Sequence, residues 1–194
     1  MTKYNIDSLI DKALHGTGDT DQHGITLFAL ACSLRAKNIL ELGVRGGGTT
    51  LPLLIASYIN DGKVTSVDLV DNGFRPPEMY NLFWNFIVED ALTFLTNNTN
   101  MYDLIYIDDL HASEHVYKEL KLISKFITNK TVIVLHDLMH TNAQPNYNTT
   151  QYYEGEWEGT GPYGGVLKFI NEHPNYEFST IPVNHGLTIL RKIL

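Results

Sequence analysis

The sequence contains a single cysteine, no long apolar segment and no cluster of basic residues. One cysteine in 194 residues cannot form an internal disulfide, so Cys32 is expected to be a small core residue. No segment approaches the roughly 20 consecutive apolar residues that cross a bilayer. The longest basic run is the pair Arg191-Lys192, and the net charge is -8. Because nucleic-acid backbones attract dense positive charge, this charge pattern disfavours nucleic-acid binding. The lack of a long apolar segment disfavours membrane insertion.

The first 15 residues also lack the continuous apolar core of a secretory signal peptide. We therefore expect a cytoplasmic protein whose partners are small molecules rather than nucleic acids or membranes, and we leave open whether it forms a homodimer. With 43% hydrophobic residues, 194 residues suffice for one well-buried domain and are few for two. We expect a single domain over 1–194, in which residues 1–24 form an N-terminal helix and loop.

A glycine-rich turn follows the first apolar run. Residues 38–42 predict a short buried strand, the glycines at 43 and 46–48 predict a tight turn, and residues from 49 on predict a helix. Glycine suits such a turn because it tolerates positive φ and lets a ligand approach main-chain N–H groups closely. Two interpretations remain open here: a cofactor-binding turn, or a tight strand-to-helix turn without a ligand.

Strands alternate with helices along most of the chain, which is typical of a parallel α/β sheet covered on both faces. The predicted strands are 38–42, 63–68, 85–88, 102–108 and 131–135. The predicted helices are 6–14, 25–36 (capped by Thr20 or Asp21), 49–60, 78–84, 90–95 and 113–127. Two further strands, 176–181 and 187–190, predict a C-terminal hairpin.

Polar residues recur where these strands end, which is the edge at which ligands bind in such sheets. They are Glu41, Asp68, Asp90, Asp108 and the pair His136-Asp137. Asp68 could cap a turn or accept hydrogen bonds from a ribose, and Asp90 could cap a helix as well as face a ligand. Asp108 and Asp137 would repel each other at one edge unless they share a cation or a proton.

These residues resemble the class I S-adenosylmethionine-dependent methyltransferases, through the run Glu41–Gly48, Asp68 and the segment Glu89–Ala91. The resemblance implies a Rossmann-like, doubly wound, mostly parallel seven-stranded sheet with a C-terminal antiparallel hairpin. It implies that S-adenosylmethionine has its amino-acid end near Glu41, its ribose on Asp68 and its adenine near Asp90. The full implied cofactor site comprises Glu41, Gly43, Arg45, Gly47, Thr49, Asp68, Leu69, Asp90, Ala91 and Asp108.

Within that family, residues 106–111 and 134–137 look most like the metal-dependent small-molecule O-methyltransferases of the catechol, caffeoyl-coenzyme A and antibiotic-sugar types. The resemblance implies a divalent metal, Mg or Mn, on Asp108, His136 and Asp137. His136 departs from the family's acidic or amide ligand, and Asp109-Leu110 depart from the Gly-Asp that relatives carry. The resemblance also implies catalytic roles for Asp108 and for His111, which stands where the catechol type has a general-base lysine.

Two histidines at the start of the helix predicted after the strand 102–108 allow other interpretations. Imidazole titrates near neutral pH, so His111 could accept a proton there, but it could also be a helix-start residue bonded to backbone. His111, Glu114 and His115 match an inverted zinc-protease pattern, which we consider coincidental at a strand-to-helix junction. His115 is expected to be an exposed helical residue.

Residues 138–164 predict a long loop with five aromatic rings among Asn, Thr and Gly and with no Lys or Arg. It suits a lid or an acceptor-binding loop, or a flexible polar insertion. The expected function is O-methylation of a small hydroxylated acceptor, a sugar or an aromatic diol, with metal assistance. The alternatives are a non-catalytic binding protein with a cofactor fold and a nicotinamide oxidoreductase, although the glycines miss the G-x-G-x-x-G spacing.

Overall fold

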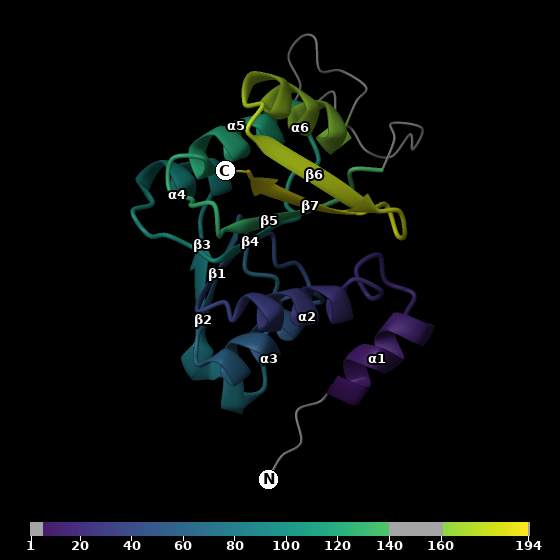
Figure 1. Ribbon diagram of the computed structural model, residues 1–194. Coiled ribbons are helices and arrows are strands. Elements are labelled where there is room, and N and C mark those ends of the chain that lie inside the picture. Colours follow the sequence, from purple (N-terminus) through teal and green to yellow (C-terminus); the bar gives the residue numbers. More distant parts are fainter. Residues whose placement is uncertain (1–5, 140–160, 194) are drawn as a thin grey trace.

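A computed structural model describes residues 6–139 and 161–193 of the chain. Its centre is a seven-stranded sheet in the order β3-β2-β1-β4-β5-β7-β6 (Figure 1). Strands β1 to β5 pair in parallel, whereas β7 is antiparallel to both β5 and β6. This arrangement confirms the predicted sheet and its C-terminal hairpin. The strands are β1 (Asn38–Leu42), β2 (Lys63–Asp68), β3 (Trp84–Val88), β4 (Leu104–Ile107), β5 (Val132–His136), β6 (Tyr176–Ile181) and β7 (Leu187–Lys192).

Helices cover both faces of the sheet, as the alternation predicts (Figure 1). The elements on one face are α1 (Ile6–His15), α2 (Gly24–Leu34), α3 (Thr50–Asn60) and the 3-10 helix η1 (Glu78–Phe83); those on the other are α4 (Ala91–Asn97), α5 (Ser113–Ile123) and α6 (Gly161–Glu172). Side chains of β1 alternate between the two cores, with Ile39 in one and Leu40 and Leu42 in the other. Within the described residues, no helix combines the length and apolarity that a membrane crossing requires.

The start of α2 differs from the prediction. Neither Thr20 nor Asp21 caps it, because α2 begins at Gly24 behind His23, whose side chain makes no capping bond. Residues 20–23 form a turn in which the His23 N–H donates to the Thr20 carbonyl (3.0 Å). The Asp21 carboxylate instead accepts from the Gly18 N–H at 2.8 Å and so shapes the loop before it. Cys32 of α2 is half-buried and packs against the core that contains Ile39.

Helix α6 is the element that the sequence did not predict. Residues 161–164, assigned to the loop 138–164, form its first turn, while residues 140–160 of that loop lie outside the described residues. Three glycines and a proline in 161–165 hide the helical pattern. Gly165 shows why glycine stands there: a Cβ at this position would collide with the Ser113 carbonyl oxygen, so its absence lets α6 pack closely on α5.

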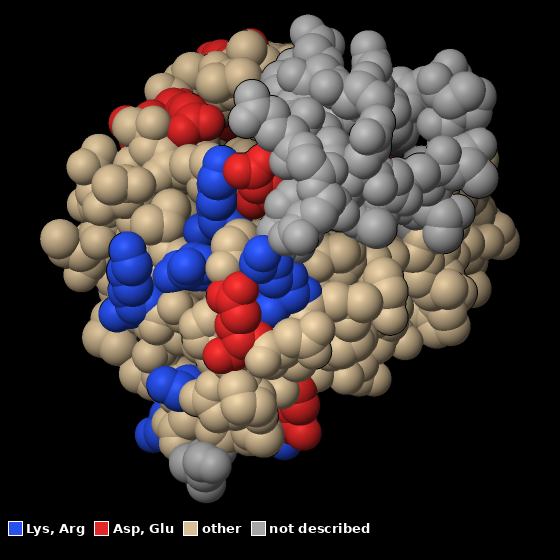
Figure 2. Space-filling model, turned by 90° about the horizontal axis from the view of Figure 1, so that it is seen from above, with Lys and Arg blue, Asp and Glu red and all other residues tan. Residues whose placement is uncertain are grey.

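The surface carries both signs of charge. Figure 2 shows Lys and Arg side chains lying among Asp and Glu side chains on the face seen from above. On α5, Lys118 pairs with Glu114 one turn earlier, with Nζ and Oε1 2.7 Å apart.

Candidate functional site

The glycine turn after β1 packs against the end of β4. Gly43 has a left-handed backbone (φ 90°), and a Cβ there would collide with the Asp108 carbonyl oxygen. Only glycine therefore allows the turn to lie so close to Asp108. A Cβ on Gly46 would meet nothing within 4 Å, so this part of the turn faces open space. Gly47 (φ 76°) lies against the Phe74 ring instead.

Asp68, at the end of β2, holds this turn in place. Its Oδ2 accepts hydrogen bonds from the backbone N–H groups of Val44 (2.9 Å) and Arg45 (3.0 Å), and its Oδ1 accepts one from Val70 (3.1 Å). The turn-capping interpretation of Asp68 is therefore correct. It is compatible with ligand binding, because Asp68 also lines a cavity.

Glu41 of β1 binds the end of the glycine turn through Thr49. Its side chain is fully buried, with Oε1 accepting from the Thr49 hydroxyl (2.8 Å) and Oε2 from the Ser66 hydroxyl (2.6 Å). Burial raises the pKa of Glu41 to about 7, although the two hydroxyl bonds oppose the rise. The sequence placed Glu41 beside the cofactor, but it lines neither cavity of the site. Ser66, which receives a further bond from the Trp84 indole (2.9 Å), was not anticipated.

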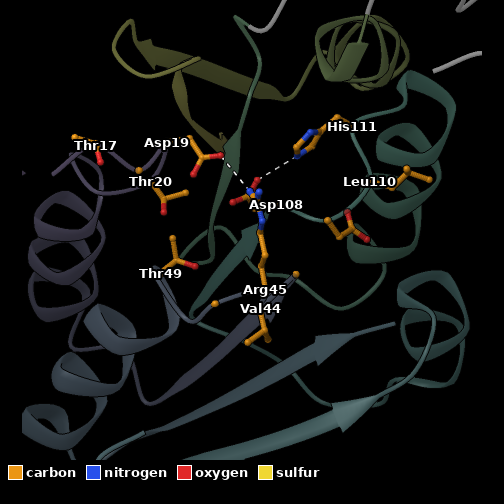
Figure 3. A pocket seen from close by; sticks show the side chains of 14 residues that line it. Thr17, Asp19, Thr20, Val44, Arg45, Thr49, Asp108, Leu110 and His111 are labelled. Carbon is orange, nitrogen blue, oxygen red and sulfur yellow. Dashed lines mark hydrogen bonds and ion pairs between the residues drawn. The ribbon is translucent and has the colours of Figure 1, made fainter. Parts of the chain in front are cut away.

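Two joined cavities lie at the carboxyl edge of the sheet. The larger, of about 810 Å³, is enclosed by the loop 17–20, the glycine turn and residues 108–111 (Figure 3). The smaller, of about 330 Å³, lies between the ends of β2 and β3 and the start of α5. They share Gly43, Arg45 and residues 108–110. Apart from Glu41 and Gly47, every predicted cofactor residue lines one or both: Gly43, Arg45, Thr49, Asp68, Leu69, Asp90, Ala91 and Asp108.

Two residues that line these cavities, Arg45 and Asp90, are held in place by contacts with neighbouring residues. Arg45 has a left-handed backbone (φ 47°), and its guanidinium lies 3.3 Å from Asp19 of the N-terminal loop. That loop was predicted only as a connection, so its contribution to the larger cavity is new. Asp90 is the N-cap of α4, with Oδ1 accepting from the Thr93 N–H (2.8 Å), and it faces the smaller cavity. Both interpretations of Asp90 are thus compatible with the structure.

Four side chains meet where β4 and β5 end, and we name Asp108, His111, His136 and Asp137 the first cluster. His111 Nε2 lies 3.2 Å from Asp108 Oδ1 and 2.9 Å from Asp137 Oδ2. His136 Nδ1 lies 3.3 Å from Asp108 Oδ1 and 3.2 Å from Asp137 Oδ1. The structure therefore brings together all the residues predicted for metal binding and for catalysis, and Figure 3 shows His111 directed toward Asp108.

Neighbouring groups orient the first cluster. His136 Nε2 lies 3.0 Å from the Asn184 carbonyl oxygen, which has no proton to give, so the imidazole donates there and turns Nδ1 toward the carboxylates. The buried Tyr106 hydroxyl donates to Asp108 Oδ2 at 3.0 Å. His185 of the β6–β7 turn brings Nδ1 within 3.2 Å of Asp137 Oδ1. Sequence reasoning gave no role to Asn184 or His185, because their approach depends on how the hairpin packs on β5.

The two carboxylates control the protonation of the imidazoles. Burial alone would lower the pKa of both histidines, but the nearby carboxylates of Asp108 and Asp137 raise it to about 9 for His111 and about 10 for His136. The pKa of each carboxyl group is lowered in return, against the effect of burial. The two carboxylates thus favour the protonated form of His111, whereas the sequence predicted an imidazole that titrates near neutrality. His111 is also bonded to carboxylates rather than to backbone alone.

The first cluster has the donors that a divalent cation needs. Ligand atoms of Asp108, His111 and Asp137 all lie within 4.8 Å of one another. Buried His136 Nδ1 and Asp137 Oδ1 face each other without hydrogen-bond geometry, and neither atom has a hydrogen-bond partner among the described residues. Atoms that would both accept from a donor converge here, so the residues fit a shared cation or proton.

A separate set of side chains, which we name the second cluster, comprises Asp109, His115 and Glu119. His115 was expected to be exposed, but only 12% of its side chain is accessible, and its Nε2 lies 3.1 Å from Asp109 Oδ2. It turns inward because it shares a face of α5 with the fully buried Glu119. His111 joins the first cluster, His115 the second, and Glu114 pairs with Lys118, so the zinc-protease pattern is not a site.

Comparisons with known proteins agree with this geometry. A family model described as a methyltransferase domain matches residues 40–138. Similar solved structures include cofactor-bound Rv0187 from MTB (18% identity, TM-score 0.66, covering 99% of this chain and 98% of that chain) and the O-methyltransferase TomG from Streptomyces achromogenes with SAM (16%, 0.66, 100% and 92%). SAH-bound PaMTH1 from Podospora anserina is also similar (16%, 0.63, 99% and 88%). No curated protein matches the sequence. At these identities the solved structures establish the fold.

Proposed function

The chain belongs to the methyltransferase-domain family, and from that premise we propose that it transfers a methyl group from S-adenosylmethionine to a hydroxyl of a small acceptor with help from a divalent cation. The observation that carries this proposal is the meeting of the glycine turn with the first cluster at one edge of the sheet. The family match favours methyl transfer over the nicotinamide oxidoreductase and the non-catalytic binding protein that the sequence left open.

The joined cavities suit a cofactor made of two parts. The smaller cavity, with Asp68 and Leu69 beside the ribose and Asp90 and Ala91 beside the adenine, would hold the adenosine. The larger cavity has room for the amino-acid part next to Thr49 and for an acceptor next to His111. When bound, the cofactor supplies a methyl group on a positively charged sulfur. That SAM or SAH is bound in TomG and PaMTH1 supports this cofactor for the same fold.

Asp108, His136 and Asp137 would hold the cation, and His111 lies beside them. The bond from His136 Nε2 to the Asn184 carbonyl keeps Nδ1 unprotonated when the ring is neutral, which is the form that binds metal. Carboxylate oxygens suit magnesium, and the imidazoles make manganese at least as suitable. Such an ion would supply a positive charge that lowers the pKa of the acceptor hydroxyl.

His111 is the base that we assign to the acceptor. It lines the larger cavity and lies on the loop before α5 with its side chain held by Asp108 and Asp137. In its neutral form the imidazole would accept the hydroxyl proton, while the sulfur–methyl bond of the cofactor breaks and S-adenosylhomocysteine leaves. The positive charge of a cation on the same carboxylates opposes their effect on the pKa of His111 and favours that neutral form.

The decisive experiment measures S-adenosylhomocysteine formation with a panel of catechols and of sugars bearing adjacent hydroxyls. We expect product with one acceptor class, loss of activity with chelator, and recovery with Mg²⁺ or Mn²⁺. Full activity in excess chelator would remove the cation from the proposal. Absence of S-adenosylmethionine binding by calorimetry would remove the cofactor and with it the proposed reaction.

A further inference from the structure

The second cluster combines the residue that follows Asp108 with two residues of α5. Asp109 follows Asp108 directly in the chain, while His115 and Glu119 lie one turn apart on α5. His115 Nε2 is central, 3.1 Å from Asp109 Oδ2 and 3.6 Å from Glu119 Oε1. All three ligand atoms lie within 4.8 Å of one another. The proposed methyl transfer gives none of these side chains a role.

Glu119 is the feature that requires explanation. Its side chain is fully buried, yet neither carboxylate oxygen has a hydrogen-bond partner among the described residues. Asp109 Oδ1 is likewise buried without a hydrogen-bond partner among them. Glu41 shows the usual solution for a buried carboxylate, since hydroxyl groups donate to both of its oxygens. A buried carboxylate without donors is strongly unfavourable unless a positive charge or a proton compensates it.

The spacing of the cluster matches tetrahedral coordination. Bonds of about 2.0–2.2 Å at tetrahedral angles separate two ligand atoms by about 3.4 Å. The observed separations from His115 Nε2, 3.1 and 3.6 Å, lie on either side of that value. Two carboxylates and one neutral imidazole carry two negative charges, so a divalent cation makes the buried assembly neutral. An imidazole in the set favours a borderline-soft ion such as zinc over magnesium.

We propose that Asp109, His115 and Glu119 bind a divalent cation of the zinc type, with a fourth position directed to the smaller cavity. Asp109 and His115 line that cavity, which leaves a path from solvent to the ion. Bound there, the ion ties the middle of α5 to the loop that carries Asp108 and His111. The inference stands on the second cluster alone and does not depend on the proposed methyl transfer.

The competing state is a cluster held by protons. Burial lowers the pKa of His115, but the hydrogen bond to Asp109 and the nearby carboxylate of Glu119 raise it to about 10. Burial, and then the charge of Asp109, raises the pKa of Glu119 to about 8. An imidazolium ion between the two acids would partly compensate them without metal. The imidazolium would lie 3.6 Å from Glu119 Oε1, which is too far for a hydrogen bond, whereas that separation suits two atoms bound to one cation, so the geometry favours a cation.

The test uses the full chain with Asp137→Asn, which removes one of the two carboxylates of the first cluster and so weakens it as a metal site. Asparagine suits this position because Asp137 has a left-handed backbone (φ 63°) that asparagine tolerates. After chelator treatment, Zn²⁺ is titrated by calorimetry and bound zinc is counted by elemental analysis. We expect one zinc per chain, a rise in melting temperature, and the intense visible bands of tetrahedral coordination when Co²⁺ replaces zinc.

Adding Glu119→Gln to that protein should weaken zinc binding at least tenfold and abolish the rise in melting temperature. Glutamine keeps the size of the side chain and removes the buried charge, and His115→Gln serves as a second variant should the first not fold. Glu114→Gln, on the same helix but outside the second cluster, is the matched control and should bind zinc normally. Equal zinc binding with and without Glu119→Gln, or no zinc bound by the Asp137→Asn protein, would overturn the proposal.

Discussion

Two adjacent aspartates, Asp108 and Asp109, lead into clusters built from the same residue types but with different balances of charge. The first cluster has two imidazoles for two carboxylates, and the pKa of both carboxyl groups is lowered. The second has one imidazole for two carboxylates, and the pKa of Glu119 is raised to about 8. The ratio of imidazoles to acids, rather than burial alone, therefore decides whether a buried carboxylate keeps its charge without a metal.

The clusters also differ in what they face. The first cluster meets the larger cavity, where the acceptor would bind, and the β6–β7 turn orients it through Asn184 and His185. Asp108 and Asp109 line both cavities, but in the second cluster His115 lines only the smaller one, and that cluster is held by α5. A group that must exchange protons with a substrate needs the first environment, while a cation that stabilises the fold needs the second. The following predictions test this division, beginning with the largest effect.

His111→Ala should lower kcat by roughly 10²–10⁴-fold, the usual contribution of a positioned general base, and leave affinity for S-adenosylmethionine nearly unchanged. The reason is that His111 lines only the larger cavity, whereas the residues assigned to ribose and adenine line the smaller one. Steady-state kinetics and cofactor calorimetry check this, with the acceptor found in the panel assay. A wild-type kcat and pH profile would take His111 out of the mechanism and remove the functional contrast between the clusters.

Glu41→Gln should remove a pH dependence of stability. The folded chain holds the Glu41 proton more tightly than the unfolded chain, because burial raises its pKa from about 4.5 to about 7. Stability is therefore full below pH 4.5 and is lost as the pH rises through 7, by up to about 3 kcal/mol. Urea unfolding at pH 5 and pH 8 should show this loss in the wild type and a smaller one in Glu41→Gln.

The exposed Glu78→Gln variant is the control for Glu41 and should follow the wild type. This experiment sharpens the comparison because Glu41 and Glu119 are both buried carboxylates, but only Glu41 accepts hydrogen bonds from two hydroxyl groups. A Glu41→Gln protein with the same pH dependence as the wild type would show that Glu41 stays ionised throughout.

Asp68→Ala should weaken S-adenosylmethionine binding by roughly 1.5–3 kcal/mol, the range for a hydrogen bond to a charged group. Because Asp68 also holds the glycine turn through Val44 and Arg45, part of the loss comes from a looser turn. Calorimetry of the cofactor, with thermal unfolding to separate the two contributions, checks this. Unchanged affinity would place the adenosine outside the smaller cavity, and hence away from the second cluster.

The sequence predicts the fold well and the site less well, for one physical reason. Strands such as Asn38–Leu42 and Lys63–Asp68 follow from local apolar runs bounded by turn residues, and their bounds match. The direction of a polar side chain depends instead on packing between distant elements. His115 turns inward, Glu41 lies beneath the turn, and α6 depends on Gly165 at its contact with α5. None of these has a local signal in the chain.

The smallest predicted effect is that of changing Glu114, which lies between His111 and His115 in the sequence but belongs to neither cluster. If the His-x-x-Glu-His pattern acted as a zinc site, Glu114 would be its acid or base, and Glu114→Gln would abolish metal binding or activity. The structure pairs Glu114 with Lys118 on the surface, an i,i+4 ion pair that contributes about 0.3–0.5 kcal/mol. We therefore expect Glu114→Gln to lower the free energy of unfolding by no more than that amount in urea titrations, with zinc content and kcat unchanged. A loss of either would mean that the two histidines act as one unit, and the separation between the first and second clusters would fail.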